Sequence, residues 1–145
     1  MTFPRISPEE AQRLMIEEGY VYLDVRTEAE FTQGHPAGAY NVPIMLPAEH
    51  GMQENAEFVR IGPATFEGAE RIVVGCRSGN RSQTAARRLL DAGFRQVVDQ
   101  RAGFGGARDP FGKQTEQGWR EAGLPCSDGV EPGRDYESLR ARATQ

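Results

Sequence analysis

Short apolar runs alternate with amphipathic segments along most of the chain. Residues 20–25 and 71–76 are nearly continuous in apolar, aromatic and β-branched side chains, which is typical of strands covered on both faces. Shorter strands are expected at 39–42 and 96–98. Because helical segments separate these strands, the order predicts an α/β fold with a central, mostly parallel sheet and helices on both faces.

Local signals indicate three helices, two of which open on capping patterns. The first, over residues 7–19, opens on Ser-Pro-Glu-Glu, in which serine caps, proline suits the first helical position and the second glutamate completes a capping box. The second, over 27–34, opens on another capping box, Thr-Glu-Ala-Glu. The third, from about 81 to 93, has an apolar face of alanines and leucines. Each segment ends at a glycine, which favours a helix stop.

Two stretches are harder to place. From 43 to 68, proline and glycine recur without a persuasive period, so we expect a helix and loops there without assigning positions. The chain is expected to form a single domain over residues 1–126. A C-terminal tail over 127–145 is expected to be loosely structured.

Length and composition limit the possible functions. At 145 residues, 38% of them hydrophobic, the chain can build one core but has no room for a second full domain. A net charge of −4 lacks the basic footprint of a nucleic-acid binder. No apolar stretch is long enough to cross a bilayer, and the residues after Met1 lack the apolar core of a secretory signal. We therefore expect a cytoplasmic protein that binds neither nucleic acid nor membrane.

The cysteines and histidines are few. Cys76 and Cys126 lie in very different contexts, and a chain of this size needs no disulfide, so both are expected to be free thiols. Neither His35 nor His50 stands at a ligand-like spacing from a cysteine, so no metal site is expected.

Cys76 is the candidate nucleophile. It ends the clearest strand, at the edge of the sheet where ligands bind in open α/β folds. A short polar loop follows and runs directly into a helix, so its backbone N–H groups can form a nest that favours anions and the thiolate. The loop residues expected to bind substrate are Arg77, Ser78, Gly79, Asn80, Arg81 and Ser82.

Purely structural roles are also possible interpretations of these residues. Cys76 could be a buried core cysteine, although the polar loop favours a reactive cysteine in an electropositive, partly exposed setting. Arg77 and Arg81 could be a solvated pair at a helix start, but at least one is expected to bind a substrate anion. Ser78 and Ser82 could donate hydroxyls or simply cap the helix.

Three segments together resemble the rhodanese superfamily. The loop Cys76–Ser82, between an Ile-Val-Val strand and an alanine-rich helix, looks like its active-site loop. Residues 23–43 are similar to its upstream segment, and residues 118–125, Gly-Trp-Arg-Glu-Ala-Gly-Leu-Pro, to its end. The resemblance spans most of the chain in the right order.

The resemblance implies a two-step reaction without a cofactor. Cys76 would take sulfane sulfur from thiosulfate or a persulfide donor and pass it to cyanide or a thiol, with the loop amides holding the persulfide. Asp24 and Arg26 match the family's aspartate and arginine after the early strand and are expected to support the loop. His35 matches a helix-ending position and is expected to be structural, since no carboxylate partner is identifiable.

This sequence departs from the family pattern in two places. Residues 107–118 separate Gly105-Gly106 from Trp119 as an insertion that could border the active-site mouth. Cys126 stands where an apolar residue is usual, and a bystander role is favoured over resolving the persulfide. Trp119 is expected to lie in the core.

Three functions fit these residues. The first is a sulfurtransferase with small-molecule donor and acceptor, or a protein thiol as acceptor. The second is a non-catalytic sulfur carrier or docking module served by a partner protein. The third is a phosphatase or arsenate reductase, which the four residues between Cys76 and Arg81 disfavour, since the related phosphatases look to have a wider loop of five. The sequence leaves open whether the chain is a monomer or a homodimer.

Overall fold

A parallel sheet forms the centre of the molecule. The computed structural model describes residues 2–66 and 70–144. Its main sheet has five strands, and every pair of neighbouring strands is parallel. In spatial order they are β1 (Arg5–Ile6), β8 (Gln96–Gln100), β7 (Arg71–Gly75), β2 (Val21–Asp24) and β4 (Tyr40–Asn41). The expected α/β class with a parallel central sheet is confirmed.

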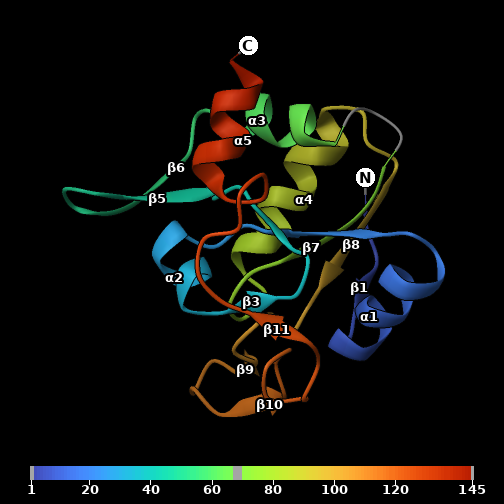
Figure 1. Cartoon of the computed structure of the whole chain (residues 1–145). Helices are drawn as coiled ribbons and strands as arrows, with labels where there is room; N and C mark the ends of the chain where they lie inside the picture. The colour runs from blue at the N-terminus through green and yellow to red at the C-terminus, as the bar shows by residue number, and fades with distance from the viewer. Residues whose placement is uncertain (1, 67–69, 145) are drawn as a thin grey trace.

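Helices cover both faces of this sheet (Figure 1). The helices α3 (Phe58–Thr65), α4 (Arg81–Asp91) and α5 (Tyr136–Ala143) gather in the upper part of the picture. On the opposite face, α1 (Pro8–Glu17) and α2 (Glu28–Gln33) contribute apolar side chains to a second core. The molecule therefore has three layers, with the sheet between two apolar cores.

Strand alternation explains the two cores. Side chains of successive strand residues point to opposite faces of a sheet. In β2, Leu23 belongs to the core under α3, α4 and α5, whereas Tyr22 belongs to the core with α1. In β7, Val74 and Val73 divide in the same way. Both faces are buried, so these strands are apolar at nearly every position, as the sequence pattern indicated.

Local capping starts the helices where the sequence placed them. The Ser7 hydroxyl accepts a hydrogen bond from the backbone N–H of Glu10 at the start of α1. At α2, Thr27 and Glu30 form the complete reciprocal capping box. Helix α4 begins at Arg81 as expected, but its N-cap residue Asn80 makes no side-chain capping bond.

The stretch from 43 to 68 contains a hairpin that the sequence did not indicate. Strands β5 (Met45–Ala48) and β6 (Gly51–Glu54) pair antiparallel, and α3 follows them. The hairpin projects from the side of the molecule (Figure 1). Every residue of β6 is exposed, so no buried face imposes an alternating pattern. The last residues of this stretch, 67–69, lie outside the described residues.

The expectation of a loosely structured tail over residues 127–145 is wrong for Ser127 and for Tyr136–Ala143, which lie in regular elements. Strand β11 (Cys126–Ser127) pairs with β3 (His35–Pro36), and α5 packs into the main core through Tyr136 and Leu139. Only these two residues of α5 are buried, so its apolar stripe is too narrow to stand out in the sequence.

Residues 107–118 contain a second hairpin, formed by β9 (Ala107–Arg108) and β10 (Gln114–Glu116) at the bottom of Figure 1.

Within residues 2–66 and 70–144, no helix is both long and apolar enough to cross a membrane.

We predict that Leu139→Ala lowers the free energy of unfolding by about 2–4 kcal/mol, because it removes a fully buried side chain and leaves a cavity. Urea unfolding followed by circular dichroism measures this change. Glu137→Ala, at an exposed position of the same helix, is the control and should stay within about 0.5 kcal/mol of wild type. Equal stability of all three proteins would mean that α5 contributes nothing to the fold.

Candidate active site

Cys76 lies immediately after β7, at the carboxyl end of the central strand of the sheet. Its Sγ accepts a hydrogen bond from the backbone N–H of Gly79 at 3.2 Å, and the thiol donates to the hydroxyl of Ser82 at 3.4 Å. An N–H donor and a hydroxyl therefore converge on the sulfur. Both can donate to a sulfur anion, so the arrangement favours the thiolate and the persulfide anion.

Cys76 is only 2% exposed and belongs to the main apolar core. The partly exposed setting expected from the sequence is therefore wrong for this residue. This burial agrees with the alternative interpretation of Cys76 as a core cysteine. That interpretation does not account for the Gly79 N–H directed at the sulfur, because an apolar side chain in place of Cys76 would leave that donor without a partner.

The loop around the sulfur is closed by backbone contacts that require glycine. Gly79 has a φ of +94°, and a Cβ at this position would lie 2.2 Å from the carbonyl oxygen of Arg101. Gly103 would place a Cβ 2.4 Å from the backbone of Arg77. The N–H groups of Phe104 and Gly105 then donate to the carbonyls of Cys76 at 2.7 Å and of Arg77 at 2.8 Å. The segment 103–105 thus holds the first peptide groups of the loop in place.

The two loop arginines have different partners. Arg81 forms a double hydrogen bond with Glu30, at 2.7 and 2.9 Å, so its charge is already neutralised. Burial raises the pKa of Glu30, but the bonds from Arg81 outweigh it and lower this pKa to about 2. Arg77 is exposed and lines a pocket beside the loop. Of the two, only Arg77 is placed to receive an anion.

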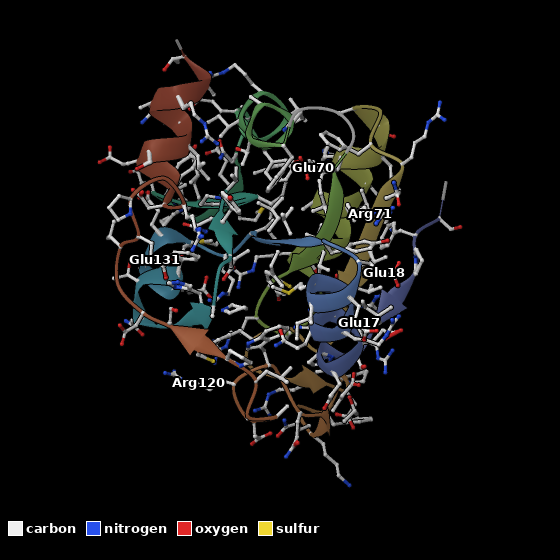
Figure 2. The ribbon with its side chains drawn as sticks, turned by 45° about the vertical axis from the view of Figure 1, so that its right-hand side comes forward. Glu17, Glu18, Glu70, Arg71, Arg120 and Glu131 are labelled. Carbon is white, nitrogen blue, oxygen red and sulfur yellow. The ribbon has the colours of Figure 1, made fainter. Side chains whose placement is uncertain are left out.

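A pocket of about 360 Å³ adjoins the loop. It is lined by Arg26, Glu30, Gln33, Gly34, Arg77, Phe104, Gly105 and Arg120. Arg120, labelled in Figure 2, comes from the segment between β10 and β11, and its guanidinium lies 5.4 Å from the centre of the Phe104 ring. Among the residues that the structure describes, neither Arg77 nor Arg120 forms an ion pair. The pocket therefore has the positive charge to attract an anion, although Cys76 itself does not line it.

Asp24 and Arg26 form a buried ion pair at the end of β2, with the closest approach at 2.7 Å. Burial opposes the charge on Arg26, but the attraction and hydrogen bonds of Asp24 hold the pKa of Arg26 above its ordinary value. Arg26 also donates to the carbonyl of Gly34 at 2.6 Å and lies over the Phe104 ring. This pair joins β2, the end of α2 and the pocket floor, which is the position of a supporting residue rather than a nucleophile or base.

His35 has the carboxylate partner that the sequence did not reveal. Its Nδ1 lies 2.7 Å from the carbonyl of Phe31, and its Nε2 lies 2.8 Å from Glu131. A carbonyl oxygen only accepts, so Nδ1 donates the hydrogen bond to Phe31. The hydrogen bond with His35 lowers the pKa of Glu131. His35 is fully buried and, through Glu131 (labelled in Figure 2), ties the C-terminal connection to α2, so its expected structural role agrees with these contacts.

The departures from the family pattern lie around the site. Trp119 is fully buried against Tyr22, in the core as expected. None of residues 107–118 lines the pocket, whereas Gly105 and Arg120 on either side of them do. Cys76 and Cys126 are both free, and burial raises the pKa of the Cys126 thiol.

Several residues of this site were not predicted from the sequence. Glu30 was recognised only as a capping residue, and the pocket residues Gln33, Phe104 and Arg120 carried no local pattern. The three glycines at 103, 105 and 106 were the one available signal, because glycine marks close backbone approach. The loop Cys76–Ser82 and the pair Asp24 and Arg26 lie at the same edge of the sheet.

We predict that part of the stability is lost in acid through Glu30. Its ordinary pKa of 4.5 falls to about 2 in the folded protein, so its contribution is complete above about pH 4.5 and disappears as the pH falls toward 2. After screening we expect about 1 kcal/mol, measured as the free energy of urea unfolding between pH 5 and 2. Glu30→Gln should flatten this part of the profile, whereas Glu54→Gln, which removes an exposed ion pair with Arg88, should not. Parallel profiles for both variants would contradict the assignment to Glu30.

The chain is similar to known proteins along most of its length. The chain is 41% identical over 107 residues to thiosulfate sulfurtransferase 16, chloroplastic, of Arabidopsis thaliana, covering 74% of this chain and 79% of the relative. It is 42% identical over 101 residues to senescence-associated protein DIN1 of Raphanus sativus, covering 70% of this chain but only 55% of that protein. The name of the Arabidopsis relative places that protein in the chloroplast, so the cytoplasmic location stays a prediction for this chain.

The fold is also similar to solved structures. The crystal structure of Rv0390 from M. tuberculosis superposes with a TM-score of 0.68 at 29% identity, covering 88% of this chain and all of the other. Residues 7–107 match the family model described as the rhodanese-like domain. These residues include α1, the Cys76 loop and the backbone segment that closes it, so the chain belongs to the rhodanese-like domain family.

Proposed function

We propose that this protein is a sulfurtransferase that carries sulfane sulfur as a persulfide on Cys76. Thiosulfate or a persulfide is the donor, and cyanide or a thiol is the acceptor. The observation that carries this proposal is the Gly79 N–H directed at the Cys76 sulfur within a tight loop. Membership of a family in which a relative bears the name thiosulfate sulfurtransferase supports it.

The reaction has two displacements at sulfur. The Cys76 thiolate attacks the outer sulfur of thiosulfate, a new S–S bond forms, and sulfite leaves with the electron pair of the broken S–S bond. The negative charge then lies on the outer persulfide sulfur, where loop N–H groups stabilise it. Cyanide attacks that sulfur, a C–S bond forms, and the electron pair of the S–S bond returns to Cys76 as thiolate. No proton or external electron is consumed.

Arg77 and Arg120 supply the charge for binding an anionic donor. Both line the pocket beside the loop, and both are free of acidic partners among the described residues. Arg81 is not assigned this role, because its guanidinium already donates two hydrogen bonds to the carboxylate of Glu30. The pocket therefore favours an anion such as thiosulfate over a neutral donor.

A sulfur-carrier function remains the second candidate, and the near-complete burial of Cys76 favours it. At 2% exposure, the sulfur is reached by a small donor only through the pocket side or after the loop moves, whereas a partner protein can open the loop on docking. Turnover of small donors by the isolated protein separates the two functions. A phosphatase function is disfavoured by the four-residue spacing from Cys76 to Arg81.

We predict that incubation with thiosulfate adds the mass of one sulfur atom to the intact protein, because the Cys76 thiolate displaces sulfite. Intact-mass spectrometry measures the adduct, and cyanide should remove it. Cys76→Ser should gain nothing, whereas Cys126→Ser, the matched control at the other free cysteine, should behave as wild type. No adduct on wild type would overturn transfer from thiosulfate, and an adduct lost with Cys126 would overturn the role of Cys76.

We also predict that Arg77→Gln and Arg120→Gln each raise the KM for thiosulfate about threefold to tenfold, because each removes a charge that attracts the donor. Steady-state thiocyanate formation measures KM and kcat. Arg108→Gln is the control, because Arg108 lies on the neighbouring hairpin outside the pocket. Equal KM values in all four proteins would show that the donor does not use this pocket.

A further inference from the structure

We propose that Arg5 is a positioning residue for the active-site loop. Its guanidinium, anchored on the buried carboxylate of Asp99, holds the carbonyl of Gly79 so that loop N–H groups face the sulfur. This inference rests on the proposed function, because the sulfur so held is the persulfide of Cys76.

The carboxylate of Asp99, on which Arg5 is anchored, is buried. Asp99 is fully buried in β8, and its Oδ2 accepts from Nε of Arg5 at 2.7 Å. Burial raises the pKa of Asp99, and hydrogen bonding by Ser82 and Arg5 opposes that rise. Strand β1 pairs with β8 in the register that sets Arg5 opposite Asp99. The guanidinium therefore starts from a fixed point beneath the loop.

From this point Arg5 reaches the loop itself. Its Nη2 donates to the carbonyl of Gly79 at 3.0 Å, and Nε2 of Gln83 donates to the same oxygen at 2.8 Å. Two donors occupy the two lone pairs of that carbonyl and fix its direction. A trans peptide group is planar, with its C=O and N–H pointing in opposite directions. Holding the Gly79 carbonyl toward Arg5 therefore turns the Asn80 N–H the other way, and we place it toward the Cys76 sulfur, where it stabilises the thiolate as well as the persulfide.

Comparison with the other arginines separates this contact from an ordinary ion pair. Arg81 and Arg101 each use two nitrogens on both oxygens of one carboxylate. Arg5 bonds only one oxygen of Asp99, through Nε at 2.7 Å. The second donor of Arg5 is used on the loop instead, which is the arrangement expected if the loop contact is what the site requires.

The test compares Arg5→Gln and Arg5→Lys in a Cys126→Ser background, where Cys76 is the remaining thiol. Arg88→Gln is the matched control, because its side chain is 39% exposed against 41% for Arg5 and its Nε also pairs with one carboxylate, Glu54. The first readout is the pH midpoint for alkylation of sulfur-free Cys76 by iodoacetamide. The second is kcat and KM for thiosulfate with cyanide as acceptor.

We expect Arg5→Gln to raise the alkylation midpoint by about half a pH unit to one pH unit, and to lower kcat about threefold to tenfold with KM unchanged. Lysine keeps the charge and can pair with Asp99, but its single nitrogen cannot bridge to the loop as the guanidinium fork does, so Arg5→Lys should show the same changes. Arg88→Gln should match the background protein in both readouts.

Two results would overturn the proposal. If Arg5→Gln and Arg88→Gln give the same midpoint and kcat, Arg5 contributes to stability alone. If Arg5→Lys behaves as the background protein, its charge matters and its fork does not. The alkylation readout needs no sulfur donor, so it decides the role of Arg5 even if thiosulfate gives no turnover, a result that would count against the proposed function instead.

Discussion

The close approach of two backbone segments is the constraint on which the site depends. The peptide groups of Arg77 and Gly103 lie so near each other that a single methyl group would not fit between them. This contact lets Phe104 and Gly105 bond the first two carbonyls of the loop, which in turn leaves the following N–H groups free to turn toward Cys76. The surroundings of the Cys76 sulfur are thus set by backbone geometry more than by neighbouring side chains.

The charged side chains around the loop divide by what they contact. Arg26 and Arg81 are neutralised by Asp24 and Glu30, and they join elements of the fold around the pocket. Arg77 and Arg120 lie at the pocket without acidic partners among the described residues. Buried or half-buried ion pairs therefore build the walls of the pocket, and the two exposed arginines give it its positive charge.

The sequence predicted the parts of the structure that depend on local signals. Capping residues located the starts of α1 and α2, an apolar face indicated α4, and the continuous apolar runs identified β2 and β7. The loop at Cys76 was recognised because strand end, polar turn and helix start are contiguous in the chain.

The remaining features depend on contacts between distant residues. Glu131 meets His35 across 96 positions, and Arg120 reaches the pocket from a segment whose place only the fold determines. Helix α5 was missed because its two buried residues make too weak an apolar pattern. The β5–β6 hairpin was missed because every residue of β6 is exposed, so its sequence does not alternate between apolar and polar residues. Burial of Cys76 was also misjudged, since a polar loop sequence does not reveal that backbone covers the sulfur.

The contact between Arg5 and Asp99 spans 94 positions of the chain, and this separation has a consequence for the order of folding. Contacts between distant residues form late, because the entropy of closing a long loop must be overcome first. Strand β1 leaves the ribosome early but has no partner until β8 has been synthesised. The helix and strand on either side of Cys76 can form while the first residues are still unpaired. The loop around Cys76 is therefore completed only when β1 pairs with β8. A nascent chain that has already folded this loop still lacks the contact from Arg5 to Gly79.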